Sequence, residues 1–134
     1  MSKQGRAWYG STVLAAVTAL AAHPAAAAPS PAARACGVIA AATAGGPVHV
    51  DAAFVSSVER YVSYRDTGKA LTLYNDFSAW ASDTENLYAV PAGNPDTAGA
   101  DAATIALIGQ GIAADKKAVT ADCKAAGVIL HLGH

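Results

Sequence analysis

The sequence predicts an all-α fold, a small helical bundle of three or four main helices closed by one disulfide. The first observation is that apolar residues recur at helical spacing through most of the chain after residue 36. The second is the abundance of alanine, the strongest helix former, together with scarce strand-like alternation. The third is a pair of cysteines, Cys36 and Cys123, near the two ends of this helical part.

Residues 1–27 have the pattern of a secretory signal peptide. Lys3 and Arg6 give a positive start, an apolar run covers 12–22, and a group of alanines supplies small residues for cleavage, which we expect after Ala27. An uncleaved anchor is the alternative, although the apolar run is too short to span a bilayer. The sequence therefore predicts a protein secreted to the bacterial exterior, periplasm or envelope, without an integral membrane segment after cleavage.

The charge of the chain argues against nucleic acid as a partner. The whole chain carries 9 basic and 10 acidic residues, and loss of Lys3 and Arg6 with the signal peptide leaves a net charge of −3. A mildly acidic surface disfavours binding to anionic polymers. We expect the partner to be an unknown protein or a component of the cell envelope.

Residues 28–35 are rich in proline, alanine and serine, so we expect a flexible spacer followed by a single helical domain over 36–134. The first helix is expected over 36–43, where small apolar residues are followed by a Gly-Gly-Pro break. The second is expected over 51–65, with Asp51 as its N-cap.

A third helix is expected from the break at 66–68 to Ala89. It is either continuous or divided around 82–85, and the divided form is favoured because Ser-Asp-Thr at 82–84 resembles a restart signal. Its apolar side is expected to include Leu73, Phe77, Trp80, Leu87 and Tyr88.

The last and longest helix is expected over 96–126, after the start signal Asn-Pro-Asp-Thr at 94–97 and before a stop at Gly127. Glycines at 109 and 111 offer a place for a kink. The apolar segment 128–132 is expected to pack back on the bundle, with a short strand against 48–50 as an alternative.

Pairing of Cys36 with Cys123 is the expected use of both thiols. Exported chains meet oxidising conditions, and two cysteines allow one intramolecular disulfide. The chain-entropy model gives a stabilisation of about 4–5 kcal/mol for so long a loop. Arg34 interrupts the pattern of a lipid-anchor site before Cys36, and the chain has no Cys-x-x-Cys motif that would indicate redox chemistry.

All aromatic residues that follow the signal peptide lie within 54–88, on the two middle helices. Core packing is the favoured interpretation, because helical spacing alone accounts for most of them. The alternative is a flat pocket for a planar ligand or a contact surface for a partner. Tyr64 and Tyr74 lie at the edges of their stripes, so we expect them to be exposed. The candidate contact residues are Tyr61, Tyr64, Tyr74, Trp80 and His49.

Metal binding and catalysis have little support in the sequence. His131 and His134 have a spacing that two metal ligands can use, but no acidic or thiol ligand accompanies them, so we expect no dedicated metal site. His49 is either a hydrogen-bonded loop histidine, which we favour, or a ligand. No motif offers a nucleophile, a base and an orienting group together, so we expect no enzyme, with a small hydrolase of unknown type as an alternative.

In outline the chain resembles the small exported helical proteins of actinobacteria, in which an alanine-rich signal peptide precedes a helical domain with a cysteine near each end. Some of these, the haemophore-like proteins, bind haem through tyrosine and histidine. The resemblance implies haem as a test ligand, with Tyr61 or Tyr64 and His49 as its ligands. The sequence predicts a secreted, non-enzymatic binding or interaction protein without a resident cofactor; the alternative is a carrier of a small apolar or planar ligand such as haem.

Overall fold

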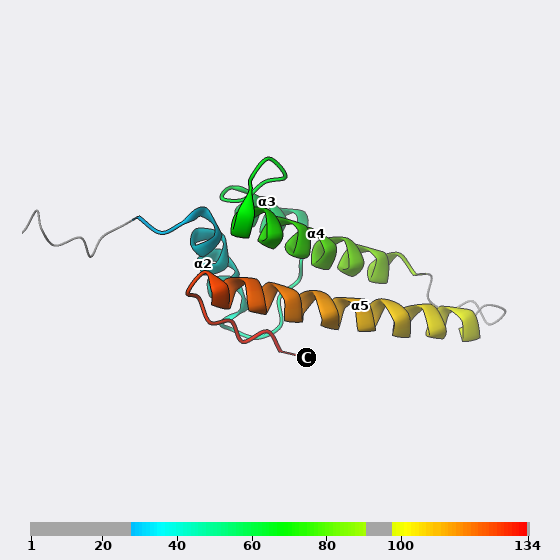
Figure 1. Ribbon diagram of the computed structural model, residues 1–134. Coiled ribbons are helices and arrows are strands. Elements are labelled where there is room, and N and C mark those ends of the chain that lie inside the picture. Colours follow the sequence, from blue (N-terminus) through cyan, green and yellow to red (C-terminus); the bar gives the residue numbers. More distant parts are fainter. Residues whose placement is uncertain (1–27, 91–97, 134) are drawn as a thin grey trace, which may run out of the picture.

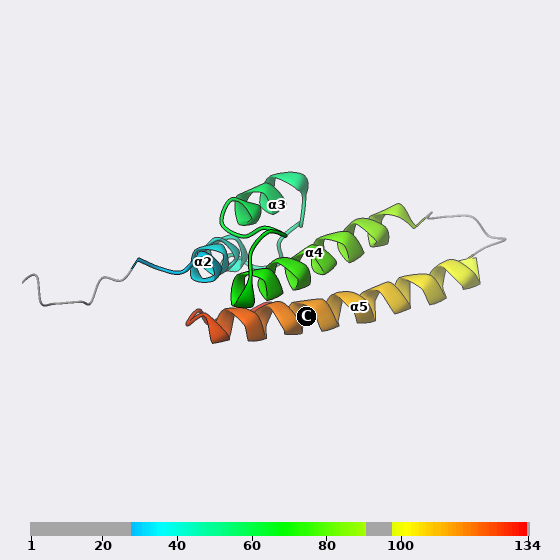
Figure 2. The ribbon, with the colours of Figure 1, turned by 45° about the horizontal axis from the view of Figure 1, so that its top comes forward.

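The computed structural model describes residues 28–90 and 98–133, and within these ranges the chain forms four helices and no strand. The helices are α2 (Pro31–Thr43), α3 (Ala52–Glu59), α4 (Gly68–Ala89) and α5 (Ala98–Ala125). The two long helices, α4 and α5, run antiparallel beside each other, and the shorter α2 and α3 gather at one end of this pair (Figures 1 and 2). The predicted all-α bundle is confirmed.

Three expectations lie outside the described residues. They are the signal peptide at 1–27, the start signal of the last helix at 94–97, and the ligand role of His134. All three therefore stay predictions from the sequence.

The expected disulfide joins Cys36 of α2 to Cys123 of α5, with 5.5 Å between the two Cα atoms and a sequence separation of 87. Both cysteines are fully buried. The bond therefore ties the first described helix to the C-terminal end of the last one, with α3 and α4 in the loop that it closes.

Helix α2 begins at Pro31, earlier than the expected start at Cys36, so the second half of the predicted spacer is helical. Ser30 caps the helix, because its hydroxyl oxygen accepts a hydrogen bond from the Ala33 N–H at 3.1 Å. Pro31 takes the first helical turn, where its missing N–H costs nothing. The buried face of α2 consists of Ala32, Ala35, Cys36 and Ile39.

Helix α3 is shorter than the predicted 51–65, because it ends at Glu59. Its N-cap is as predicted, with the Asp51 carboxylate accepting from the Phe54 N–H at 2.8 Å. After Glu59, the Asp66 carboxylate accepts from the Ser63 N–H at 2.7 Å. This local side-chain bond offers the backbone an alternative to the helix and explains the early end.

Helix α4 is continuous, so the favoured division around 82–85 is wrong. Thr84 does not cap a new helix: it is buried, and its hydroxyl donates to the Trp80 carbonyl within α4 at 2.8 Å. Helix α5 also continues through Gly109 and Gly111, and Figures 1 and 2 show no kink there. Packing against the partner helix therefore outweighs the local signals for a break.

The stop at Gly127 is confirmed. This glycine has φ +88°, the Val128 N–H donates to the Cys123 carbonyl at 2.8 Å, and the Gly127 N–H donates to the Lys124 carbonyl at 3.0 Å. These two bonds form a Schellman motif, which turns the chain back along the bundle. Leu130 is then buried, so the expected packing of the apolar C-terminal segment is also confirmed.

The core lies where all four helices meet. Phe54 of α3 and Phe77 and Trp80 of α4 pack edge to face, with ring centroids 5.6 to 6.2 Å apart. Around them lie the buried side chains Ile39, Val58, Val62, Leu73, Val119 and Leu130. The favoured interpretation of these three aromatic residues, as core, is thus confirmed.

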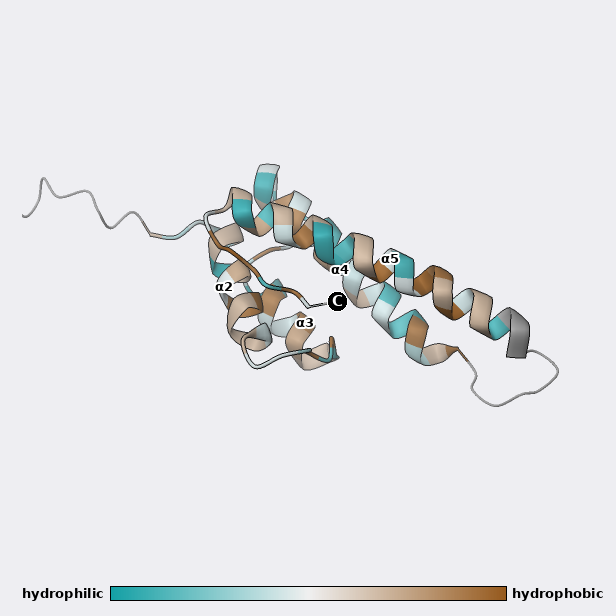
Figure 3. Cartoon of the chain, turned by 90° about the horizontal axis from the view of Figure 1, so that it is seen from below, coloured by the Kyte–Doolittle hydropathy of each residue, from teal (hydrophilic) through white to brown (hydrophobic). Residues whose placement is uncertain are grey.

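In the half of α5 that extends beyond α2 and α3, large apolar side chains are exposed to solvent. Val119 and Cys123 are fully buried, whereas Ile105 is 44% and Leu107 68% exposed. Figure 3 shows hydrophobic segments along this outer half of α5. The apolar residues of α5 are therefore fully buried only toward its C-terminal end.

Replacement of Phe77 by alanine is expected to lower the free energy of unfolding by about 3–5 kcal/mol, because it leaves a cavity against Phe54 and Trp80. Urea unfolding followed by circular dichroism measures this loss. The control is Tyr64→Ala at a 66% exposed position, where we expect a loss below about 1 kcal/mol. Equal losses in the two variants would contradict the placement of the core.

Candidate functional site

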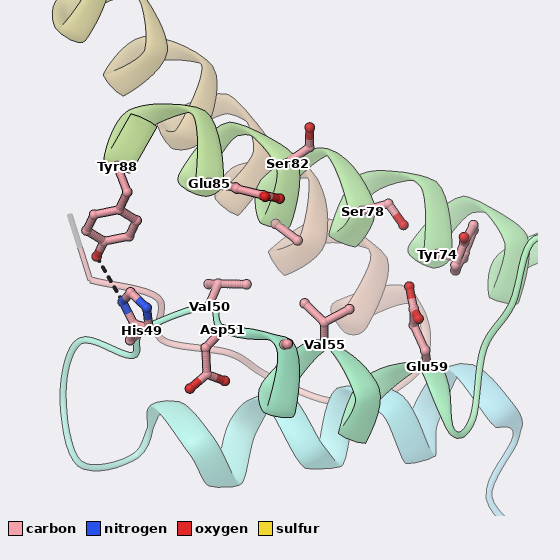
Figure 4. A pocket seen from close by; sticks show the side chains of 12 residues that line it. His49, Val50, Asp51, Val55, Glu59, Tyr74, Ser78, Ser82, Glu85 and Tyr88 are labelled. Carbon is pink, nitrogen blue, oxygen red and sulfur yellow. Dashed lines mark hydrogen bonds between the residues drawn. The ribbon is translucent and has the colours of Figure 1, made fainter. Parts of the chain in front are cut away.

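A solvent-open cleft of about 610 Å³ lies between α3 and α4 (Figure 4). One wall comes from α3 and the connection before it, and the other comes from one side of α4. The lining residues are His49, Val50, Asp51, Ala52, Val55, Glu59, Tyr74, Ser78, Ala81, Ser82, Glu85 and Tyr88.

The two ends of the cleft each pair a tyrosine with a polar group from the opposite wall (Figure 4). Tyr88 of α4 faces His49 at one end, and Tyr74 of α4 lies opposite Glu59 of α3 at the other. Glu85 lies on α4 between the ends. Val50 and Val55 supply apolar surface between the walls, so the cleft offers aromatic, apolar and acidic groups together.

His49 and Tyr88 form the one side-chain hydrogen bond drawn across this cleft. The distance from His49 Nδ1 to the Tyr88 hydroxyl is 3.0 Å, and the two rings are tilted with centroids 4.8 Å apart. His49 is held in place because Asp51, two residues later, caps α3. The favoured interpretation of His49 as a hydrogen-bonded loop histidine agrees with this geometry.

The charge of the cleft has one sign. Its charged lining residues are Asp51, Glu59 and Glu85, and no lysine or arginine is among the lining residues. The Asp51 carboxylate is engaged with the N-terminus of α3, whereas Glu59 and Glu85 are exposed. A ligand that enters the cleft therefore meets negative charge from both walls.

Two of the expected contact residues lie together at the Glu59 end. Tyr64 is 66% exposed, and its ring centroid is 6.5 Å from that of the half-buried Tyr74. Arg65 fixes Tyr64: its guanidinium lies 5.4 Å from the ring centroid, and its Nε donates to the tyrosine oxygen at 3.1 Å. Tyr64 thus extends the aromatic surface beyond Tyr74.

The other expected contact residues lie elsewhere. Trp80 is 2% exposed, and a hollow of only about 50 Å³ adjoins it, so its expected contact with a ligand or partner is wrong. The cause is α3, which brings Phe54 against the indole. Tyr61 is half-buried in a separate surface hollow with Arg34 and Arg60, so it is not near His49.

Residues that sequence reasoning missed complete the cleft. Tyr88 was expected on the buried side of its helix but is 65% exposed, because α4 extends beyond the end of α3. The sequence predicts no binding role for Glu59 or Glu85, whose pattern is that of ordinary solvated carboxylates. The unequal lengths of α3 and α4 could have predicted the exposure of Tyr88, since a short helix cannot cover the whole apolar stripe of a longer one.

A second hollow, of about 590 Å³, lies on the outer face of α5 beside the C-terminal segment. Its charged residues are Lys116, Lys117 and Lys124, and Ile112 and Leu132 contribute apolar surface. The two hollows are thus of opposite charge, one acidic and one basic.

The described residues hold no metal cluster, and Ser78 of the cleft lacks a hydrogen-bond partner. No group of three or more histidine, cysteine, aspartate or glutamate side chains among them could hold a metal ion. The Ser78 hydroxyl in the cleft has no hydrogen-bond partner, so it is not activated by His49. His131 is exposed on the C-terminal segment.

Across the helices that the structure describes, none combines the length and the hydropathy needed to cross a bilayer. Comparisons of the chain with protein-family models, with curated proteins and with solved structures found no match. The function must therefore be argued from the cleft.

Replacement of Tyr88 by phenylalanine removes one partner of the cross-cleft hydrogen bond. We expect the Nδ1 resonance of His49 to shift in ¹⁵N NMR spectra, because this nitrogen exchanges a protein partner for water. Tyr64→Phe is the control, since that hydroxyl bonds Arg65, and it should leave His49 unchanged. A His49 spectrum that is the same in Tyr88→Phe and the unmutated protein would contradict the geometry.

Proposed function

We propose that this chain is an exported, non-enzymatic binding protein of the bacterial exterior or envelope, and that the α3–α4 cleft takes a cationic ligand with an apolar or aromatic body. The observation that carries the proposal is the lining of the cleft, which combines exposed carboxylates from both walls with tyrosines at both ends and no basic side chain. The ligand is either a small organic cation or a basic side chain of a partner protein.

Each part of the lining supports this choice of ligand. Glu59 and Glu85 attract positive charge, while the rings of Tyr74 and Tyr88 offer aromatic surface whose faces stabilise a cation next to an apolar body. Val50 and Val55 give the apolar body surface to bury. An anionic ligand would meet the same carboxylates as repulsion.

Export is supported by the signal pattern of residues 1–27 and by the disulfide. A Cys36–Cys123 bond forms and persists in oxidising compartments, as expected outside the cytoplasm. The non-enzymatic assignment is supported by the unpartnered Ser78 hydroxyl, since a serine nucleophile needs a base within hydrogen-bond reach.

A carrier of haem is the second candidate, and the His49–Tyr88 pair is the observation in its favour. A tyrosine hydrogen-bonded to a histidine is a suitable oxygen ligand for ferric iron, because the histidine can take the phenol proton. The residues differ from those implied by the resemblance, since Tyr61 and Tyr64 are not beside His49. The propionates of haem would face Glu59 and Glu85, which is why we rank this candidate second.

A matched pair of probes tests the main proposal: phenethylammonium and phenylacetate, which share a ring and differ in charge. We expect the ammonium to shift amide NMR signals along the cleft and the carboxylate not to. Glu85→Gln should weaken ammonium binding about 3- to 10-fold, and added salt should weaken it further. Asp101→Asn, at an acidic position of α5 outside the cleft lining, is the control and should bind normally.

Preferential binding of phenylacetate, or ammonium shifts confined to residues outside the cleft, would overturn the main proposal. Haemin titration followed by absorption separates the second candidate. A saturable Soret band that is lost in Tyr88→Phe and in His49→Ala, but kept in Tyr64→Phe, would favour the haem carrier. A spectrum equal to that of free haemin would remove it.

A further inference from the structure

The face of α4 that looks away from the cleft carries two aspartates, Asp76 and Asp83, spaced two helical turns apart. The facing helix carries two more, Asp115 and Asp122, with the same spacing. Because the helices are antiparallel, Asp76 lies beside Asp122 and Asp83 beside Asp115, close enough within each pair for a carboxyl–carboxyl hydrogen bond. The largest helix–helix interface of the described chain thus contains two carboxyl–carboxyl contacts.

Gly111 shows that the Asp83 carboxyl is set closely against α5. A Cβ atom added to this glycine would lie 3.0 Å from Asp83 Oδ2, whereas at Gly109 of the same helix it would meet nothing within 4 Å. Glycine inside a helix costs about 1 kcal/mol relative to alanine. Helix α5 therefore has a destabilising residue at the point where the Asp83 carboxyl approaches it.

Among the described residues, burial and other carboxylates are what raise the pKa values of Asp115 and Asp122, with no basic side chain among the causes. Two lysines of the long helices are engaged with backbone carbonyls: Lys69 donates to Ala125 at 3.1 Å and Lys116 donates to Gly133 at 3.2 Å. Helix α2, which packs against both long helices, has one charged residue, Arg34, and it is exposed. His131 on the returning C-terminal segment is exposed as well.

The buried oxygens of the pairs need a proton. Oδ2 of Asp115 and Oδ2 of Asp122 are shielded from solvent and accept no hydrogen bond from an N–H or hydroxyl group of the described residues. An ionised carboxylate only accepts hydrogen bonds, so two facing carboxylates are satisfied only when one of them is protonated and donates. A shared proton also removes the repulsion between two like charges.

We propose that the α4–α5 interface is a proton-dependent joint, in which the pairs Asp76–Asp122 and Asp83–Asp115 each share one proton when the helices pack and loosen when it is lost. Burial and the adjacent Asp76 raise the pKa of Asp122 from 3.8 to about 7. Burial, with Asp83 and more distantly Asp76, raises the pKa of Asp115 from 3.8 to about 6.

The direction of the pH dependence follows from these raised pKa values. The folded protein holds protons that the unfolded chain releases near pH 3.8, so the stabilisation is complete below that pH. It is lost as the pH rises through about 6 for Asp115 and about 7 for Asp122. The α4–α5 interface is therefore more stable in mildly acidic surroundings and less stable above neutrality. The joint acts on the α5 side of α4 and does not depend on what the cleft binds.

The test uses the disulfide-bonded chain and follows its melting temperature from about pH 4.5 to about pH 8.5. We expect the melting temperature to fall by at least about 5 °C across this range, and to be nearly flat in Asp115→Asn/Asp122→Asn. Glu85→Gln, an exposed change on the same α4, should keep the unmutated slope. A melting temperature that is constant or rises with pH, or a double variant with the unmutated slope, would overturn the proposal.

Carboxyl ¹³C NMR of the unmutated protein gives a second reading that does not need a stable variant. Asp115 and Asp122 should titrate near pH 6 and 7, and titration of both near the ordinary value of about 4 would refute the shared protons.

The close contact at Gly111 supplies a third reading. Gly111→Ala should lower the melting temperature in the unmutated chain and raise it in an Asp83→Ala background, where the clash is gone. An increase in both backgrounds would show that Asp83 does not press on α5.

Discussion

The disulfide between Cys36 and Cys123 is the constraint on which the rest of the fold depends. A domain this small, with much of its apolar content in alanine, buries few large side chains. The bond fixes α2 against the C-terminal end of α5, and the aromatic core of Phe54, Phe77 and Trp80 forms beside that junction. Closure of a loop across 87 positions removes much of the freedom of the unfolded chain.

This constraint acts at one end of the molecule only. Away from it, α4 and α5 depend on each other, and α4 is used on two sides. One side forms a wall of the acidic cleft with Glu85 and Tyr88, and the other meets α5 through Asp76 and Asp83. Helix α4 carries neither cysteine, so its position is set by the core around Phe77 and Trp80 near the disulfide and by the carboxyl contacts with α5 along its length.

Periodicity and capping chemistry predicted much of this fold, because those signals are local. The cap at Asp51, the stop at Gly127 and the helical face around Phe77 followed from residues within one or two turns. The early end of α3, the continuity of α4 and the helical start at Pro31 did not. Each depends on competition between local bonds and packing, such as the Asp66 turn after Glu59, and the sequence does not rank these.

The candidate site was less accessible from the sequence because it is assembled from distant segments. His49 and Tyr88 lie 39 positions apart and meet because α4 runs back along α3 to the point where α3 begins. The aspartate pairs were hidden for the same reason: each carboxylate alone resembles an ordinary solvated residue. Trp80 failed as a contact residue because the spacing that marks a helical face does not say which neighbour covers it.

Hydrogen exchange of the amides, compared between the disulfide-bonded protein and the same protein with Cys36 and Cys123 reduced, tests the role of the bond most directly. If the bond organises the fold, reduction will speed exchange throughout α2 and in the C-terminal turns of α5, and the core amides of α4 around Phe77 will follow. Exchange in α2 and at the core that is the same in both forms would contradict the account.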